Sequence, residues 1–349
     1  MKSDTVALIK ELVCVAGPSG YEQAVGEIIQ REVSSFGEVT TDAIGNIVCE
    51  IPGTREDGKR TLFAAHQDEI GFMISGILEN GFLRFVPIGG WNPRTLPSST
   101  VDIITAEGAV VVGTIGQIPP HFLKQGADEK PEIDSMSLDI GAESARDVKE
   151  VFGVEIGNVA VPSSTFRYDE RNGTLMAKAF DDRIGVAALI ELGRRVHEKP
   201  VSGTVVLAFT TQEEVGLRGA TVLSRNVTAD AAWIVEGAPA DDMPGGPEIP
   251  QTCVGKGAHV RIFDPTHIGN LGLLKLARSV ARTRGIQIQE TVRRGGGTDA
   301  AVIALAGKGI PTLVSGVPVR YAHSHVGVAS LKDYLSLVDL LYAVVEDSE

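Results

Sequence analysis

The chain has 349 residues, of which 43% are hydrophobic and 22% are charged, and its formal net charge is −13. This length predicts about two domains, and the near-average composition excludes collagen-like, coiled-coil and largely disordered chains. The acidic charge argues against a nucleic-acid partner, because such partners reward basic surfaces. No apolar run reaches the roughly 18 residues of a membrane span, so no membrane partner is expected.

The N-terminal residues and the cysteines bear on the cellular compartment. Met1-Lys2-Ser3-Asp4 leads into a mixed helix rather than into the apolar core of an export signal. The cysteines, Cys14, Cys49 and Cys253, are odd in number and far apart, which is typical of a reducing compartment. The sequence therefore predicts a soluble cytoplasmic protein.

The N-terminal part of the chain predicts two helices followed by strands. Apolar residues recur at helical spacing in 6–13 and in 25–33, and Ser19-Gly20-Tyr21-Glu22 has the spacing of a capping box before the second helix. Strands are predicted at 46–51 and at 61–65, and the second is apolar almost throughout. Such a run is typical of a central strand that is covered on both faces.

From about residue 71 to residue 162 the pattern changes. Short apolar runs at 72–74, 81–86 and 109–114 are separated by Gly, Pro and Asn. This spacing is typical of a small barrel or sandwich rather than of βαβ units. We therefore expect an inserted β-rich domain at 71–162.

After residue 180, helices and strands alternate. Helices are predicted at 184–196, 220–224, 271–284 and 331–345, and strands at 203–209, 231–235 and 310–314. This alternation predicts a largely parallel sheet. The expected fold class is α/β, with one domain built from residues 1–70 and 163–349 and the β-rich domain inserted into it.

Histidines and carboxylates stand where the predicted strands end. These residues are His66, Asp68, Asp181, Asp182, Glu213, Glu214, Glu236 and His323. Ligands of α/β sheets gather at the carboxyl ends of strands, so these side chains are expected to meet. Each alone has an ordinary structural explanation, such as a hydrogen-bonded histidine, a helix N-cap or a solvated charge pair. Their coincidence favours a cation site.

The mixture of imidazole and carboxylate groups suits zinc, cobalt or manganese. Two metals that share a carboxylate stand about 3.5–4 Å apart and can hold a hydroxide between them. Hydrolysis then needs a general base that is close to the hydroxide and not bound to a metal. The adjacent glutamates can divide this work, with Glu214 as a ligand and Glu213 as the base. Asp68 can hold the far ring nitrogen of His66.

Several motifs resemble those of one peptidase family. They are Ala65-His66-Gln67-Asp68-Glu69-Ile70-Gly71, Phe180-Asp181-Asp182-Arg183, Gln212-Glu213-Glu214-Val215-Gly216, Gly296-Gly297-Thr298-Asp299-Ala300 and Pro318-Val319-Arg320-Tyr321-Ala322-His323-Ser324. The chain resembles the tetrahedral (TET) aminopeptidases, also called glutamyl or deblocking aminopeptidases, some of which carry an endoglucanase label. The likeness runs from the N-terminal helices to the last helix, with every motif in the family's order.

The resemblance implies a di-zinc exopeptidase α/β domain with an inserted PDZ-like β-barrel that acts in oligomerisation. It implies an aminopeptidase that acts on short peptides, with two divalent metal ions per subunit, zinc first and cobalt as the alternative. It also implies a homo-oligomer, a hollow dodecamer built from dimers. In this clan the peptide bond after the bridging aspartate is often cis.

Motif positions imply a role for each site residue. Asp181 would bridge the two metals. His66 and Glu236 would bind one metal, and Glu214 and His323 would bind the other. Glu213 would be the general base, and Asp68 would orient His66. Glu236 stands where many members have Asp, so a longer side chain reaches the metal here. For His121 and His325, incidental or structural roles are the simpler interpretation.

The glycines at 295–297 lack the lysine and the spacing of a phosphate-binding P-loop. Gly296 and Gly297 instead predict close approach of the backbone beside the substrate, with Asp299 near the peptide's amino end. Lys256, Arg261, Arg293 and Arg294 either supply a positive pocket wall or are solvated charges, so the preferred N-terminal residue stays open between acidic, basic and apolar.

Two alternative functions belong to other classes. An endoglucanase needs two carboxylates that flank a sugar bond and usually aromatic platforms, but aromatic residues make up only 5% of this chain. It would also leave the histidines unexplained. A non-catalytic metal-binding scaffold would require the loss of the base or of a ligand, whereas every candidate position holds a competent residue.

Overall fold

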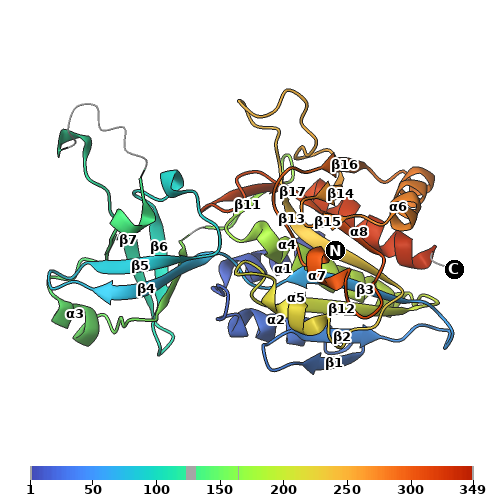
Figure 1. Ribbon diagram of the computed structural model, residues 1–349, viewed down its shortest axis with the longest axis horizontal. Helices are drawn as coiled ribbons and strands as arrows, with labels where there is room; N and C mark the ends of the chain where they lie inside the picture. Colours follow the sequence, from blue (N-terminus) through green and yellow to red (C-terminus); the bar gives the residue numbers. More distant parts are fainter. Residues whose placement is uncertain (1, 123–130, 164, 348–349) are drawn as a thin grey trace. The chain divides into compact units, whose positions relative to one another are not determined.

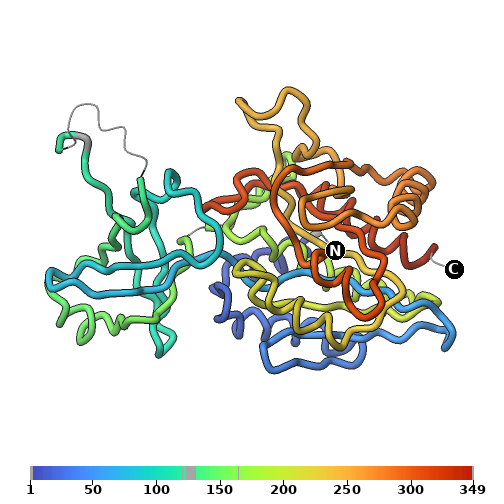
Figure 2. Tube along the Cα trace, viewed as in Figure 1, coloured from blue at the N-terminus to red at the C-terminus, as the bar shows by residue number. Residues whose placement is uncertain are grey.

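The structure is a computed structural model that describes residues 2–122, 131–163 and 165–347. Contacts within the chain divide it into two units, each with its own hydrophobic core. The first unit contains residues up to 69, 166–322 and from 326 onward, and the second contains 70–165 and 323–325. Figure 2 shows that the blue N-terminal and red C-terminal segments both belong to the larger unit.

The larger unit is built on a mixed sheet with the strand order β1-β2-β12-β3-β13-β17-β14-β15, and β16 pairs with β14 (Figure 1). Its strands are β1 (Glu38–Thr41), β2 (Ile47–Ile51), β3 (Arg60–His66), β12 (Thr204–Thr210), β13 (Ala231–Pro239), β14 (Ala258–Asp264), β15 (His267–Ile268), β16 (Ile288–Val292) and β17 (Thr312–Val319). The central strands β12, β3, β13 and β17 are mutually parallel. The expected α/β class with a mostly parallel sheet is confirmed.

Helices cover both faces of this sheet. They are α1 (Lys2–Cys14), α2 (Gln23–Val33), α4 (Phe180–Glu198), α5 (Arg218–Leu223), α6 (Leu271–Arg284), α7 (Ala300–Ile303) and α8 (Leu331–Glu346). The larger core cluster draws on α1, α2, α4, α6 and α8, whereas a smaller cluster on α5 and α7 packs against the other face. A small sheet of β10 (Arg167–Asp169), β11 (Thr174–Ala177) and β18 (Gly327–Ser330) completes the unit.

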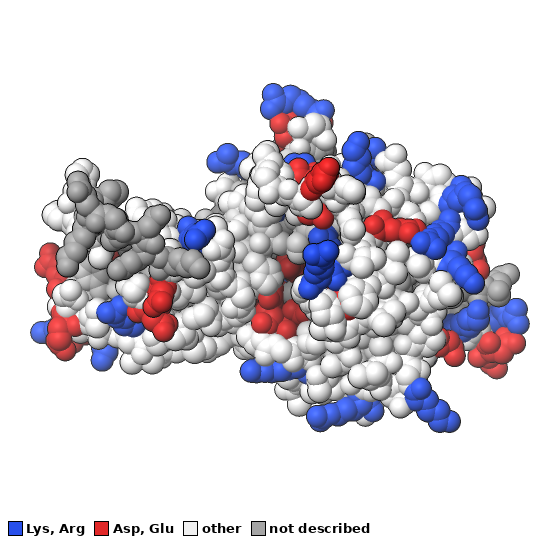
Figure 3. Space-filling model, turned by 45° about the horizontal axis from the view of Figure 1, so that its top comes forward, with Lys and Arg blue, Asp and Glu red and all other residues white. Residues whose placement is uncertain are grey.

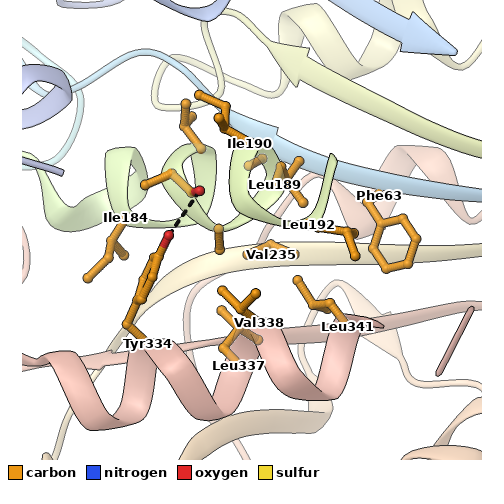
Figure 4. Packing of buried hydrophobic residues seen from close by; sticks show 14 of the residues in the cluster. Phe63, Ile184, Leu189, Ile190, Leu192, Val235, Tyr334, Leu337, Val338 and Leu341 are labelled. Carbon is orange, nitrogen blue, oxygen red and sulfur yellow. Dashed lines mark hydrogen bonds between the residues drawn. The ribbon is translucent and has the colours of Figure 1, made fainter. Parts of the chain in front are cut away.

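The packing of α4 and α8 against β13 shows how the core aligns a candidate site residue. Tyr334 of α8 is fully buried, and its hydroxyl donates to the Ala187 carbonyl of α4 over 3.0 Å (Figure 4). Val235 of β13 lies in this core. Because neighbouring side chains alternate across a strand, Glu236 faces the opposite side of the sheet.

The second unit is a closed barrel with the strand order β4-β5-β8-β7-β6-β9. Its elements are β4 (Gly71–Ile77), β5 (Leu83–Ile88), η1 (Pro93–Thr95), β6 (Thr100–Ile104), β7 (Val110–Ile115), η2 (Pro120–Phe122), η3 (Ile133–Ser135), β8 (Leu138–Asp139), α3 (Ala145–Glu150) and β9 (Val159–Pro162). The strand pairings that close it are antiparallel. Of the barrel or sandwich that the Gly- and Pro-punctuated runs predicted, the structure has the barrel.

Two local predictions differ from the structure. The second helix begins at Gln23, and its N-cap residue, Glu22, makes no side-chain cap bond, so Ser19 and Glu22 do not form a capping box. The strand expected at 310–314 begins at Thr312 and continues to Val319.

Within the described residues, no helix is long and apolar enough to cross a membrane. On the face drawn in Figure 3, basic and acidic side chains of the described residues are interspersed, and the basic ones form no continuous stripe there.

Candidate metal centre

The candidate ligands of the larger unit lie at one edge of its sheet. His66 is the last residue of β3 and stands opposite Thr210, the last residue of β12. Glu236 lies in β13, the neighbour of β3 on the other side. Because these strands are parallel, their carboxyl ends meet at the same edge, where α/β sheets bind ligands.

His66 is the centre of two groups of side chains that can hold a cation. Its Nε2 lies 3.1 Å from Asp181 Oδ1, and 3.9 Å from one carboxylate oxygen each of Glu213 and Glu236. One group consists of His66, Asp182 and Glu236, and the other of His66, Asp181 and Glu214. In each group the possible ligand atoms lie within 4.8 Å of one another. The donor set of one imidazole and several carboxylates fits zinc or a similar divalent cation.

Asp68 lies behind His66 and is fully buried. Its Oδ1 is 3.2 Å from His66 Nδ1, and its two oxygens accept the backbone N–H groups of Glu213 and Glu214 over 3.0 and 3.2 Å. A carboxylate beside Nδ1 favours the tautomer in which Nδ1 carries the proton and Nε2 offers its lone pair. The arrangement therefore suits His66 for binding a cation through Nε2.

The two adjacent aspartates play different parts in the structure. The peptide bond between Asp181 and Asp182 is cis, as the resemblance led us to expect. The carboxylate of Asp182 accepts the backbone N–H groups of His66 and Gly185 over 3.2 and 3.1 Å, so it caps the regular part of α4 and ties it to β3. Asp181, in contrast, faces the ring nitrogen of His66.

Gly237 allows the Asp181 backbone to approach β13. A Cβ at Gly237 would lie 2.4 Å from the Phe180 carbonyl oxygen and 2.8 Å from Asp181 Cα. Only glycine leaves room for this contact, which brings Asp181 beside Glu236.

The carboxylates of this centre repel one another and are short of positive charge. Burial, together with other carboxylates, raises the pKa of Glu213 and of Glu236 well above its ordinary value, although His66 opposes the shift. Burial lowers the pKa of His66, but Glu213, Asp181 and Asp68 outweigh this effect and raise that pKa well above its ordinary value. A divalent cation is the kind of countercharge that such a cluster lacks.

His323 belongs to the second unit, and there its Nδ1 lies 2.7 Å from the Gly90 carbonyl oxygen. A carbonyl only accepts, so Nδ1 carries the proton and Nε2 has the lone pair that a metal ligand needs. His325 packs its ring against Trp91 at 5.6 Å, and burial lowers its pKa to about 4. His121 lies in η2 and is exposed.

The residues predicted to lie near the substrate are found at different depths. Asp299 is buried, accepts a hydrogen bond from the Thr210 hydroxyl over 2.5 Å, and has its pKa raised to about 6, chiefly by burial. Gly296 and Gly297 are exposed, and Gly296 has a φ of +83°, a conformation that favours glycine. The Asp299 carboxylate is also one of the charges that raise the pKa of Glu213, after burial and Glu236.

Gly237, Ser19 and Glu22 support the centre, and the sequence patterns did not predict these roles. Asp182 was grouped with the candidate ligands, and a helix N-cap was its ordinary structural explanation. Gly237 was not considered, and Ser19 and Glu22 were assigned to a helix cap. The adjacency of Gly237 to a candidate ligand was the available signal for it. Ser19 and Glu22 gave no such signal, because their partners lie far away in the sequence.

Comparison with known proteins shows the family of the chain. The family model described as M42 glutamyl aminopeptidase matches residues 45–340. The chain belongs to this family. The glutamyl aminopeptidase of Lactococcus lactis subsp. cremoris is 31% identical over 97% of this chain and 94% of its own length. The M42 family protein described here is thus an aminopeptidase, a hydrolase of the exopeptidase type, and its family uses divalent metals.

Solved structures give the same result for the fold. The TET aminopeptidase of a marine-sediment Thaumarchaeota archaeon has a TM-score of 0.94 and 36% identity, covering 99% of this chain and 97% of that one. The TET1 peptidase of Pyrococcus horikoshii, which can assemble into a tetrahedron or a large octahedral shell, has a TM-score of 0.87 and 34% identity, covering 98% and 99%. As the resemblance implied, a similar structure from Thermotoga maritima carries the name endoglucanase, at 28% identity, a TM-score of 0.78 and 97% coverage of both chains.

Proposed function

We propose that this M42 aminopeptidase removes N-terminal residues from short peptides with the help of two divalent metal ions, Zn²⁺ in the first place and Co²⁺ as the alternative. The observation that carries the proposal is the group of His66 and four surrounding carboxylates, with ligand atoms within 4.8 Å of one another in each of two subsets. His66, Asp182 and Glu236 are buried, and Asp181 and Glu214 are half-buried. One histidine and four carboxylates are more donors than a single four-coordinate cation takes, which supports two neighbouring ions rather than one.

In this proposal Asp181 bridges the two ions. His66 and Glu236 complete one metal site, and Glu214 and His323 complete the other. The contact of Asp181 Oδ1 with His66 Nε2 at 3.1 Å supports the choice of Asp181 over Asp182, whose oxygens both accept backbone N–H groups. The Nδ1 contact of His323 with Gly90 supports its role, because it leaves Nε2 as the ligating nitrogen.

Glu213 is the general base. When bound, the metal ions would lower the pKa of a water molecule and polarise the scissile carbonyl. Glu213 accepts the proton of the attacking water and delivers it to the amino group that leaves. Its largely buried carboxylate, with a pKa raised by burial and by Glu236, is suited to hold that proton between the two steps. Asp68 keeps His66 in the ligating tautomer.

Asp299, Gly296 and Gly297 lie beside the substrate in this proposal. The buried Oδ1 of Asp299 has no hydrogen-bond partner among the described residues, which supports a role in receiving the peptide's amino group. A free N-terminus is the feature that distinguishes an aminopeptidase substrate.

The assembly and the compartment are part of the same proposal. We assign residues 1–70 and 163–349 to catalysis and the barrel at 71–162 to oligomerisation, giving a dodecamer built from dimers. The assembly of the Pyrococcus horikoshii TET1 peptidase supports this. The cysteines Cys14, Cys49 and Cys253 are free, which supports a reducing, cytoplasmic location.

A single assay tests the function. The purified protein is incubated with a peptide library and, separately, with cellulose, each with and without a chelator. We expect release of free amino acids that the chelator abolishes, and no reducing sugar. Release of reducing sugar, or inability to cleave any peptide in the presence of Zn²⁺ or Co²⁺, would contradict the proposal.

A further inference from the structure

The N-terminal segment before α2 reaches into the metal centre. Ser19 and Glu22 are both buried, and Glu22, the N-cap residue of α2, makes no side-chain cap bond there. The hydroxyl of Ser19 donates to Asp68 Oδ2 over 2.6 Å. Glu22 Oε1 accepts the backbone N–H groups of Gly20 and Gln212 over 2.8 and 3.0 Å. Both side chains therefore contact either the residue behind His66 or the loop that carries Glu213.

That loop, residues 211–217 between β12 and α5, is called the base loop below. Its consecutive backbone N–H groups from 211 to 214 all donate to side chains from the N-terminal part of the chain. The acceptors are Asn46 Oδ1 for Thr211, Glu22 Oε1 for Gln212, Asp68 Oδ1 for Glu213 and Asp68 Oδ2 for Glu214, at 3.0, 3.0, 3.0 and 3.2 Å. Carboxylate acceptors make stronger bonds to N–H groups than neutral acceptors do.

The base loop needs such support because its backbone is strained. Gln212, directly before Glu213, has a φ of +52°, in the left-handed region that residues other than glycine rarely adopt. A conformation of this kind is unfavourable and persists only where the surroundings hold it in place. The bond from Gln212 N–H to Glu22 acts directly on the strained residue.

Asp68 links the base loop to the ring of His66. One of its oxygens faces His66 Nδ1 and the N–H of Glu213, and the other accepts from Glu214 and from Ser19. The Ser19 hydroxyl thereby fixes the rotation of the carboxylate. If this rotation changed, a candidate ligand and the loop that carries the candidate base would move together.

We propose that Ser19 and Glu22 are positioning residues that hold the base loop in its catalytic conformation. Ser19 acts through Asp68 and Glu22 acts through Gln212. The inference rests on the proposed role of Glu213 and extends it to a segment that does not touch the reacting atoms.

The test compares substitutions that remove an acceptor or donor with substitutions that keep it. Ser19→Ala and Glu22→Ala should each lower kcat at least about tenfold with little change in KM, since small misplacements of catalytic groups cost up to about 10²-fold. Ser19→Thr keeps a hydroxyl, and Glu22→Gln supplies an amide oxygen that can accept from both N–H groups. These two variants should therefore retain most of the parent kcat. Ser34→Ala and Glu27→Ala are matched controls on exposed positions of the α2 region and should leave kcat unchanged.

Hydrogen exchange supplies a readout that does not depend on activity. In metal-free protein, the peptide that spans 211–217 should exchange faster in Ser19→Ala and Glu22→Ala than in the parent, and at the parent rate in the controls. If kcat and exchange of this peptide stay at parent values in both variants, the proposal is overturned. It is also overturned if exchange increases uniformly across the larger unit, because that is the result of a purely structural role. An inactive parent refutes the proposed function, whereas an active parent with fully active variants refutes only this inference.

Discussion

The division of labour between the paired glutamates gives the sharpest test of the mechanism. Glu213→Gln keeps the size and polarity of the side chain but removes its capacity to accept the proton of the attacking water. The Glu213 side chain is 12% exposed, and its Oε2 lies 3.9 Å from His66 Nε2, so little bulk water can substitute for it.

The size of the effect follows from the role. A positioned general base contributes about 10²–10⁴-fold to the rate. Since about 1.36 kcal/mol of activation free energy corresponds to a factor of ten, the loss amounts to roughly 3–5 kcal/mol. We expect kcat of Glu213→Gln to fall by about 10²–10⁴-fold. Its metal content should stay at the parent level, because no ligand is removed.

Glu214→Gln is the matched comparison one residue away. It removes a charged ligand, so one metal should bind more weakly, and activity should partly return when metal is added. The assay measures kcat on an aminoacyl reporter substrate together with elemental analysis of both variants. Metal loss in Glu213→Gln with retention in Glu214→Gln would reverse the two roles. Full activity in both variants would refute the di-metal reasoning, since a solvated charge pair changes stability by only about 0.5 kcal/mol.

Four further predictions concern metal, assembly and stability. Elemental analysis should find two divalent ions per chain, and their removal by a chelator should abolish activity; less than one ion per chain with full activity would contradict this. Light scattering at micromolar concentration should give a mass far above 36.9 kDa, and a monomer would argue against the dodecamer. Gly237→Ala should destabilise the protein by about 1–3 kcal/mol in denaturant unfolding, because the new Cβ would lie 2.4 Å from the Phe180 carbonyl oxygen. Gly295→Ala is the control and should not change stability, because the space around Gly295 is open. Burial, with Arg261 and Arg293, lowers the pKa of His259 well below its ordinary 6.5. The folded protein therefore loses stability as pH falls below 6.5, because there the unfolded chain binds a proton that the folded chain does not. His259→Gln should lose less stability than the parent between about pH 7 and about pH 5.5, and an equal loss would refute the assignment.

The sequence predicted the parts of the fold that depend on strong local patterns. The apolar run at 61–65 became β3, and the helical spacing at 331–345 became α8, because both patterns match a single environment. The positions of His66 and Glu236 at one edge of the sheet followed from the parallel order of the strands. These inferences needed no knowledge of distant contacts.

Other features depend on contacts that no local pattern records. Ser19-Gly20-Tyr21-Glu22 has the same spacing whether it caps a helix or binds Asp68 and Gln212, and only the tertiary structure distinguishes the two. Asp181 and Asp182 are likewise equivalent in the sequence, and only their contacts in the structure, with the His66 ring and with backbone N–H groups, distinguish them. Sequence patterns therefore located the centre and the carboxylate of Asp68 beside His66, but not the roles of Ser19 and Glu22.

The interruption of the larger unit by the barrel affects the order in which the protein can fold during its synthesis. β3 is made early, but its two neighbours in the sheet are β12 and β13, so it cannot be paired on both sides until residue 239 has left the ribosome. The barrel strands pair only with one another and are complete by residue 162. We therefore expect the barrel to form first on the nascent chain, while the apolar β3 stays exposed and in need of protection by chaperones.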